Sequence, residues 1–336
     1  MSLRQRVVIL VAVVVVSAGS GLAYVLNQRA QQQEVAQSAP AVLTADLAAV
    51  RAEPHIIFRS TALGPTYGKV AAVTLADPSG PRAVTGTDCE RVYAAAKRVL
   101  CLAADRGIVT TYSAKVLDEA FREVRPLDLS GIASRARLSR DGSLAATTTF
   151  VSGHSYASTS FSTQTLVSEV DSSSSSNVED FALVHQGKRI KPTDLNVWGV
   201  TFADDDTFYA TVAWGGKTWL SRGSLSQRRL ETIRQDAECP SLSPDRGKVV
   251  YKKRLGQPAG QWRLASYDLS TRKETLLAEP RSVDDQVEWL DDSTVMYGLP
   301  RPGTEAAVTD VWSLPIDGDG TATRLIAGAW SSAVVR

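Results

Sequence analysis

One hairpin pattern recurs along this chain and limits its fold more than any other feature of the sequence. In "LSPDRGKVVY", residues 242–251, an apolar strand runs into a tight polar turn and leaves as a second apolar strand. Six such segments align, with turns at Ala52-Glu53-Pro54, Ala96-Lys97-Arg98, Arg140-Asp141-Gly142, Asp204-Asp205-Asp206, Asp245-Arg246-Gly247 and Asp291-Asp292-Ser293. The turn centres (53, 97, 142, 205, 246 and 292) lie 44, 45, 63, 41 and 46 residues apart.

A repeat of about 45 residues that is built from short strands is typical of propeller blades, each of which has four strands. A second hairpin follows the first within the units, as in "WRLASYDLSTRKETLLAE", residues 262–279. Asp, Gly and Pro suit the turns, whereas Val, Ile, Tyr, Phe and Thr suit the strands. The sequence therefore predicts an all-β fold, a six-bladed β-propeller.

Two segments need separate interpretation. The step of 63 residues contains "SGHSYASTSFSTQTLVSEVDSSSSSNVED", residues 152–180. We expect this segment to extend one loop of the third unit, with the serine run Ser172–Ser176 as a flexible part of it. The C-terminal "AWSSAVVR" begins like another blade, and we expect Ser332–Val335 to pair into the first blade. Such pairing would close the ring and remove an exposed sheet edge.

The N-terminal segment predicts a membrane anchor. Arg4 and Arg6 precede an uncharged run from Val7 to Leu26, which is long enough as a helix to span a hydrocarbon core of about 30 Å. We expect residues 1–26 to form a cytoplasmic stub and a transmembrane signal-anchor helix, 27–42 a polar tether, and 43–336 the propeller. A cleavable signal peptide is the alternative, because Gly21-Leu22-Ala23 is a plausible cleavage site. The apolar run continues past that site, which favours the anchor.

The distribution of charged residues predicts the cellular location of the propeller and argues against one class of partner. The positive flank should stay in the cytoplasm, which predicts a single-pass protein of the cell membrane with its propeller outside the cytoplasm. The 336 residues include 37 basic and 36 acidic ones, for a net charge of +1. This balance argues against a nucleic-acid partner, which usually requires a basic stripe.

Three cysteines are present, namely Cys89, Cys101 and Cys239. Cys89 and Cys101 flank a predicted hairpin centred near Ala95, and residues equidistant from a hairpin centre face each other across the strands. A Cys89–Cys101 disulfide is therefore geometrically reasonable in an exported domain. Two buried thiols are the alternative. No Cys-x-x-Cys spacing exists, which argues against a zinc or redox motif.

The repeat resembles a known family. "LSPDRGKVVY" followed by "YDLSTRKETLL" is similar to the repeat of TolB-type propellers, in which Ser-Pro-Asp-Gly precedes a Tyr or Phe strand and Asp-Leu-x-x-Gly. The third unit ("LSRDGSLAAT") and the sixth ("WLDDSTVMYG") match less well, and the first two match weakly. The likeness covers roughly residues 43–336. TolB has an α/β domain before its propeller, where this chain has an anchor and a tether, so the resemblance implies a TolB-like propeller and not TolB's translocation role.

We expect a binding site at one mouth of the central channel. In a propeller the Ser-Pro-Asp-Gly hairpins lie on one face, and the links between blades gather on the opposite face, around the channel mouth. The residues predicted to lie there are His154, Tyr156, Asn196, Trp198, Glu238, Arg281, Asp284 and Asp285. Trp198 is predicted to be an exposed aromatic anchor, whereas the other six tryptophans are expected to pack between blades.

Metal binding and catalysis receive little support from the sequence. Glu238, Asp284 and Asp285 could hold a hard cation such as calcium, with a solvated acidic loop as the alternative, and no cofactor is otherwise predicted. Asp317-Gly-Asp319-Gly-Thr321 resembles the start of a calcium loop but lacks the distant Glu, so we expect a turn. The chain has three histidines and no Gly-x-Ser-x-Gly elbow. It also lacks the hydrolase domain that TolB-like propellers cap in prolyl oligopeptidases, so it is not predicted to be an enzyme.

These observations together predict a membrane-tethered propeller that binds a protein or peptide partner as an adaptor or scaffold at the cell envelope. A module that senses a small molecule, glycan or cation is the alternative, and a hydrolase or lyase comes third.

Overall fold

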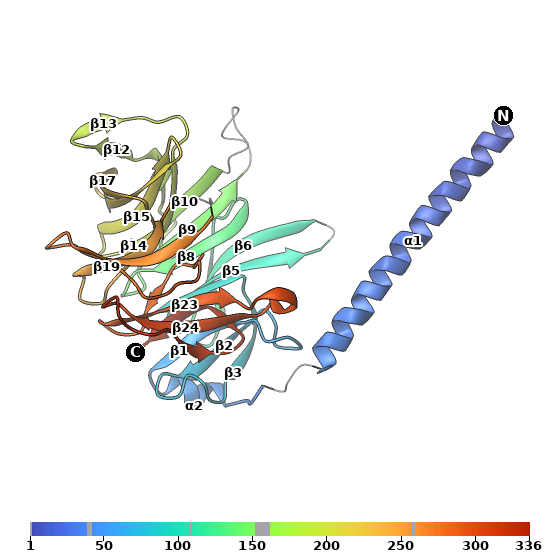
Figure 1. Ribbon diagram of the computed structural model, residues 1–336, viewed down its shortest axis with the longest axis horizontal. Helices are drawn as coiled ribbons and strands as arrows, with labels where there is room; N and C mark the ends of the chain where they lie inside the picture. The colour runs from blue at the N-terminus through green and yellow to red at the C-terminus, as the bar shows by residue number, and fades with distance from the viewer. Residues whose placement is uncertain (1, 39–41, 108, 152–161, 257–259) are drawn as a thin grey trace.

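The computed structural model describes residues 2–38, 42–107, 109–151, 162–256 and 260–336. It shows a six-bladed β-propeller and one long helix, α1 (Leu3–Ser38), that stands apart from it (Figure 1). The predicted all-β propeller preceded by one apolar helix is therefore confirmed.

Each blade has a core of four antiparallel strands, of which the first lies beside the central axis. From the axis outward, the first blade consists of β26 (Ala329–Val335), β1 (His55–Ser60), β2 (Lys69–Thr74) and β3 (Ala83–Asp88). The second consists of β4 (Arg91–Ala95), β5 (Arg98–Arg106), β6 (Thr110–Leu117) and β7 (Glu123–Leu127). The third consists of β8 (Ile132–Leu138), β9 (Leu144–Val151), β10 (Ser162–Glu169) and β11 (Ser175–Asn177).

The remaining blades follow the same order. The fourth consists of β14 (Asn196–Phe202), β15 (Thr207–Trp214), β16 (Lys217–Ser224) and β17 (Arg229–Gln235), with β12 (Ala182–His185) and β13 (Lys188–Ile190) added outside β17. The fifth consists of β18 (Ala237–Leu242), β19 (Lys248–Arg254), β20 (Trp262–Asp268) and β21 (Glu274–Leu276). The sixth consists of β22 (Glu288–Trp289), β23 (Thr294–Pro300), β24 (Thr309–Pro315) and β25 (Thr323–Ile326). Two short 3₁₀ helices, η1 (Val178–Asp180) and η2 (Gly303–Glu305), lie in the connections.

The recurring turn joins the first two strands of a blade, and its Asp side chain holds it together. In the fifth blade, Asp245 accepts hydrogen bonds from the Ser243 hydroxyl (2.5 Å) and the Gly247 amide (2.9 Å). The Ser243 hydroxyl oxygen in turn accepts from the Lys248 amide (2.9 Å). These contacts hold the pKa of Asp245 below its ordinary value. We call the side of the propeller with these turns the hairpin face, and the side with the links between blades the mouth face.

The first unit differs from the other five. A helix, α2 (Leu47–Arg51), precedes its turn where the other units have a strand, and the Asp46 side chain caps that helix. The missing inner strand is supplied by β26, which pairs antiparallel with β1 from His55↔Val335 to Ser60↔Ala329. The expectation that the C-terminal segment closes the ring is confirmed, and the prediction of a complete hairpin in the first unit is wrong.

The chain enters the propeller at this same blade. Leu43 and Ala45 hydrogen-bond through their backbones to Arg82, next to β3. Arg82 is 9% exposed, and its guanidinium donates to the carbonyls of Ala327 (2.7 Å) and Gly328 (3.3 Å), just before β26. The entering segment, the outer strand and the closing strand are thus fastened to one another.

The long step has a different origin from the one predicted. Residues 162–169 form the third strand of the third blade, and the serine run Ser172–Ser176 forms a turn and the start of β11. Much of the extra length lies in the link to the fourth blade, where η1 and the hairpin of β12 and β13 extend that blade. β12 pairs in parallel with β17, which makes a six-stranded sheet. Burial alternates along β10, with Thr163, Thr165 and Val167 buried, but two of these three residues are polar, so the sequence "STQTLVSE" carries no clear strand pattern.

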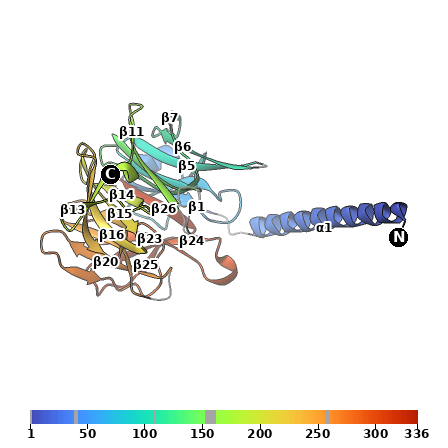
Figure 2. The same ribbon diagram turned by 90° about the horizontal axis from the view of Figure 1, so that it is seen from above.

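The N-terminal helix is longer than its apolar part. One stretch, Leu3–Asn27, has the length and composition of a membrane-spanning helix, with mean hydropathy 2.4 and no burial within the structure. The helix continues to Ser38 through the segment that was expected to be a tether. Figure 2 shows α1 extending away from the blades. An exposed apolar helix of this length is typical of a membrane anchor or a signal peptide.

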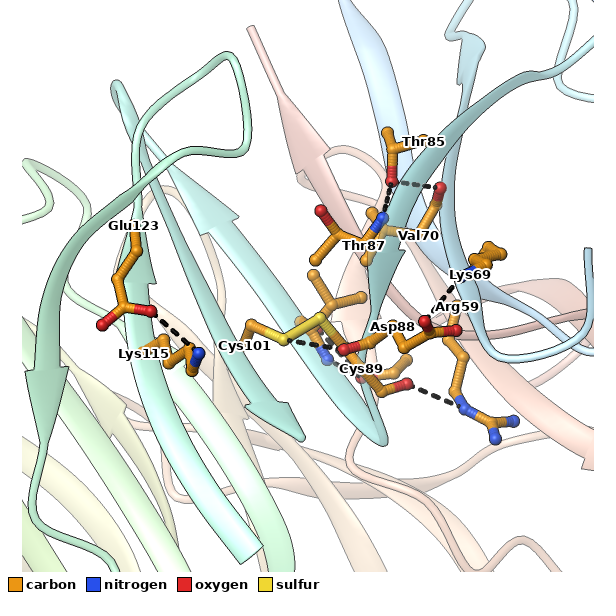
Figure 3. The surroundings of a disulfide bond; sticks show 12 residues. Arg59, Lys69, Val70, Thr85, Thr87, Asp88, Cys89, Cys101, Lys115 and Glu123 are labelled. Carbon is orange, nitrogen blue, oxygen red and sulfur yellow. Dashed lines mark hydrogen bonds and ion pairs between the residues drawn. A yellow bond between two sulfur atoms is a disulfide. The ribbon is translucent and has the colours of Figure 1, made fainter. Parts of the chain in front are cut away.

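The Cys89–Cys101 disulfide is present, with a Cα–Cα distance of 5.5 Å. Its geometry differs from the prediction, because Val92 lies opposite Cys101 in the hairpin and Cys89 precedes β4. The bridge therefore joins the link from the first blade to the second strand of the second blade (Figure 3). Arg59 Nε donates to the Cys89 carbonyl (2.9 Å), which fixes that link to β1 as well. Cys239 is a buried free thiol, as expected.

Deleting residues 330–336 should destabilise the propeller strongly. The deletion leaves β1 without its ladder and exposes the edge of the sheet, and several backbone hydrogen bonds at about 1 kcal/mol each are lost. Urea unfolding followed by tryptophan fluorescence should show a stability loss of about 5 kcal/mol or no cooperative transition. Ser332→Ala, which keeps the strand, is the control. An unchanged midpoint in the deletion variant would contradict the closing role of β26.

Replacing both bridged cysteines by alanine should cost about 3 kcal/mol, the value for closing a short loop. The bridge spans 12 residues. In urea titrations with and without dithiothreitol, the reductant should shift the natural chain toward the double variant and leave the variant unchanged. Cys239→Ala is the matched control and should keep its sensitivity to the reductant. If the reductant does not shift the natural chain, the bridge contributes nothing to stability.

Candidate functional site on the propeller axis

The inner strands are bulged where they pass the channel. The register of β14 against β15, of β18 against β19, of β26 against β1 and of β8 against β9 shifts near the mouth face. Gly199, Cys239 and Ser331 have positive φ at these bulges. A Cβ on Gly199 would lie 2.8 Å from the Cys239 Cα, so only glycine fits there. Bulges redirect side chains and free backbone groups from pairing, which sets up the polar interior of the channel.

Charged side chains fill the mouth end of the channel. Arg91 lies 3.4 Å from Asp285 and stacks on Trp330 at 3.8 Å. Lys252 lies 2.5 Å from Asp284 and 4.2 Å from the Trp262 ring centroid.

Their surroundings shift several pKa values. Burial lowers the pKa of Arg91 to about 10, with the neighbouring Arg135 acting in the same direction. Burial acts to raise the pKa of Asp284, but Lys252 and Arg135 outweigh it and hold that pKa below its ordinary value. Asp284 is therefore charged, and both Asp carboxylates are internally paired.

Gln286 crosses the channel below these ion pairs. Its side-chain amide donates to the carbonyls of Val200 (3.2 Å) and Pro240 (2.8 Å), which lie next to the bulges of β14 and β18. One side chain from the sixth blade thus satisfies backbone acceptors of the fourth and fifth blades. Buried carbonyls left without a donor are costly, so Gln286 holds three blades together at the axis.

A third ion pair lies deeper along the axis. Arg137 binds Glu288, donates to the Val287 carbonyl (3.1 Å) and stacks on Tyr93 at 4.5 Å. Tyr93 donates its hydroxyl to Glu288 (3.2 Å). Burial raises the pKa of Glu288 despite the neighbouring Arg137, and burial also raises the pKa of Tyr93. Arg137 and Glu288 are both largely removed from water, at 6% and 12% side-chain exposure.

A cavity of about 300 Å³ opens beyond this pair, on the hairpin face. We call it the axial pocket. Residues from all six blades line it, and most belong to the inner strands or the turns that follow them. The lining includes Tyr93, Arg137, Phe202, Leu242, Glu288 and Val334. Because every blade contributes to it, this pocket is a property of the closed ring and not of any one blade.

The structure uses most of the predicted site residues internally. Asn196 accepts hydrogen bonds from the Thr163 amide (2.7 Å) and hydroxyl (3.3 Å), and so joins the third and fourth blades. Trp198 lies in β14 and is 9% exposed, so the prediction of an exposed anchor in a link is wrong. The adjacent Gly199 lies against Cys239 of the fifth blade, so this part of β14 is packed closely against that blade.

The charged residues that were predicted for the site are also engaged in contacts within the propeller. Glu238 is buried and pairs with Arg254 (2.5 Å). Arg281 pairs with the fully buried Glu279 (2.6 Å) and stacks on Trp312 at 4.0 Å. Asp284 keeps 63% side-chain exposure, whereas Asp285 is buried. His154 and Tyr156 lie outside the described residues.

The three carboxylates proposed for a hard cation do not converge. Glu238, Asp284 and Asp285 each face a different cation, namely Arg254, Lys252 and Arg91. Within the described ranges, no group of three His, Cys, Asp or Glu side chains is placed to hold a metal ion. The Asp317 carboxylate accepts from the amides of Asp319 and Gly320, which is the turn that was expected there.

Sequence reasoning missed Arg137, Tyr93, Gln286 and the hairpin-face position of the pocket. The available signal was polar residues at the inward positions of the predicted inner strands, as in "RVYAA" and "IASRARL". That signal could be used only once the inner strand of each blade was known.

No family model matches the chain, and no curated protein matches it in sequence. Among solved structures, TolB from Acinetobacter baumannii is similar over 84% of this chain and 67% of its own, with TM-score 0.59 and 14% identity. A puromycin-hydrolysing peptidase from Mycobacterium tuberculosis (TM-score 0.47, 14% identity, 78% and 42% covered) and the propeller domain of the Trilobed protease from Pyrococcus furiosus (0.42, 13%, 70% and 70%) are more distant.

The fold and its axis define the class: this chain is a six-bladed β-propeller with a polar, ion-paired channel. Its likeness to TolB makes it more specifically a TolB-like propeller in fold, which confirms the resemblance read from the hairpin repeat.

Two of the ion pairs in the channel, Arg137–Glu288 and Lys252–Asp284, should respond differently to mutation. Arg137→Met leaves Glu288 buried without its cation and should cost about 3–5 kcal/mol. Lys252→Met leaves Asp284 partly exposed and still 3.7 Å from Arg135, so its cost should stay within about 1 kcal/mol. Urea unfolding of both variants checks this. The double variant Arg137→Met/Glu288→Gln should recover most of the loss. A Lys252→Met cost that exceeds the Arg137→Met cost would contradict this assignment.

Proposed function

We propose that this chain is a non-enzymatic binding module, held at a membrane by α1, that binds a segment of a protein partner in the axial pocket. The observation that carries the proposal is the pocket itself. It has about 300 Å³ of space, lies where six inner strands end, and opens on the face with the short hairpin turns. Loop ends around a rigid scaffold are where propellers and other β folds most often bind their partners.

Two features support a cellular location for the module. Cys89 and Cys101 are bridged, and disulfides persist in oxidising compartments outside the cytoplasm. Arg4 and Arg6 precede the apolar helix, and positive flanks stay on the cytoplasmic side. Both features support a propeller on the outer side of the cell membrane, at the cell envelope. An adaptor or scaffold is the role that suits such a location.

Binding is favoured over catalysis by the partners of the two described histidines. His55 Nδ1 lies 2.8 Å from the Glu53 carbonyl oxygen, and His185 Nδ1 lies 2.9 Å from the Thr232 hydroxyl. Neither contact gives a serine with a base and an orienting carboxylate, as a hydrolytic triad requires. The axial pocket holds a buried Arg–Glu–Tyr group instead, which is suited to recognition.

Photocrosslinking tests both the function and the face. We would place p-benzoylphenylalanine at Phe202, which lines the axial pocket, and in a separate variant at Phe150, which is 39% exposed near the mouth end of β9. Both are aromatic-for-aromatic replacements and are matched in size. Crosslinks are formed in intact cells and identified by mass spectrometry. We expect one protein partner from Phe202 and none from Phe150.

The other outcomes are equally informative. A partner captured from Phe150 and not from Phe202 would move the site to the mouth face, where Asp284 and Arg281 were first predicted to bind. No protein from either position would contradict a scaffold role. A small molecule would then become the leading ligand, because the pocket volume lies at the lower end of the range for small-molecule sites, about 300–1,000 Å³.

A further inference from the structure

The axial pocket carries an excess of positive charge. Four arginines line it, Arg137, Arg140, Arg246 and Arg336, and among the lining residues Glu288 is the one acidic side chain. The lining side chains therefore have a net charge of +3, from four positive groups and one negative group. The whole chain has a net charge of only +1, so this concentration is local.

The two ends of the axis differ in how their cations are neutralised. At the mouth end, Arg91, Arg135 and Lys252 each face Asp284 or Asp285. At the hairpin end, Arg137 faces Glu288, whereas Arg140 and Arg246 form no ion pair with a carboxylate in the described part of the chain. Arg336 donates to the Leu290 carbonyl. Arg246 interacts with Asp204 only at longer range, beyond 4.0 Å. Cations around a concave site that have no close carboxylate attract anionic groups and raise their local concentration.

Arg137 also has one unused donor. Its two terminal nitrogens bind Glu288 and the Val287 carbonyl. Its Nε is buried and has no hydrogen-bond partner among the described residues. Arg137 as a whole is only 5% exposed, so this donor is closed to solvent. Arg137 therefore contributes positive charge to the floor of the pocket and not a free hydrogen-bond donor.

We infer that the axial pocket binds an acidic peptide, whose carboxylates contact Arg140 and Arg246 while the Arg137–Glu288 pair forms the floor of the pocket. Leu138 and Phe202, which also line the pocket, would pack against the aliphatic part of the acidic side chains. This inference rests on the proposed function and gives its partner a chemistry: a carboxylate-rich segment. Arginine suits the role because its planar donors match carboxylate geometry.

Fluorescence anisotropy with a labelled hexaglutamate peptide tests the inference on the full chain in detergent. We expect saturable binding, which Arg140→Ala/Arg246→Ala weakens by about tenfold, because two exposed charges that contact the peptide are lost. Both residues lie in or next to exposed turns, so the variant should fold. Arg272→Ala/Lys273→Ala, in a turn of the fifth blade on the same face, removes equal charge outside the axial pocket and should leave binding unchanged. Hexaglutamine should not bind.

A second variant tests the contribution of Glu288, which lies at the floor of the pocket. Glu288→Gln removes the competing carboxylate and keeps the residue's size, so hexaglutamate should bind more tightly by severalfold. Equal losses in the axial double variant and the Arg272→Ala/Lys273→Ala control would overturn the inference, because they would show general charge attraction. Free glutarate could also compete with the labelled peptide. If glutarate competes as strongly as unlabelled hexaglutamate at the same concentration of carboxylates, the inferred peptide ligand would be wrong and a small carboxylic acid would be indicated.

The inference and the proposed function can fail separately. If Phe202 crosslinks a partner but hexaglutamate neither binds nor competes with it, the pocket is a protein site of another chemistry and only the inference falls. If hexaglutamate binds at the axis but no protein is captured, the basic pocket stands and the scaffold role falls.

Discussion

Pairing of β26 with β1 is the interaction on which the rest of the structure depends. The two strands come from opposite ends of the propeller sequence, and their ladder converts a row of blades into a ring. Only a closed ring has an axis, and both the ion-paired channel and the axial pocket are assembled from all the inner strands around it. Closure also brings Trp330 over Arg91 and sets the Ser331 hydroxyl against the backbone of Val92. The seam is therefore part of the candidate site as well as a source of stability.

The central channel contains buried charged side chains, and their contacts explain how this β fold accommodates them. Bulges in four inner strands free backbone groups, and Gln286 supplies donors for two of them. Buried cations meet carboxylates or aromatic rings, as Lys252 does with Asp284 and Trp262. Replacing such a pair by apolar groups often costs nothing, whereas breaking it costs several kcal/mol. The polar channel is thus better explained by specificity, in the seating of each blade and in ligand recognition, than by stability.

The fold could be predicted from the sequence because the residues that mark a propeller repeat lie close together in the chain. Turn residues such as Asp245 and Gly247 act within a few positions, so their spacing reveals the blades. The site could not be predicted in this way, because it depends on which strands become inner strands and how their bulges turn the side chains. Trp198 illustrates the difference: its neighbours in sequence suggest a link, yet the Gly199 bulge places it in a buried strand. The disulfide partners were predicted correctly from an imperfect geometry, because Cys89 precedes β4 and reaches Cys101 from the link.

Entry and exit of the chain at one blade have a mechanical consequence. His55 and Val335 are paired at the same end of the seam, so a pull between the N-terminal anchor and a partner held near Val335 would peel this ladder open one hydrogen bond at a time. Peeling is the weakest direction in which to load a β-sheet. The backbone bonds from Leu43 and Ala45 to Arg82, and the α2 turn after them, fasten the chain before it reaches β1. They direct tension applied through α1 to the side of the blade and spare the seam.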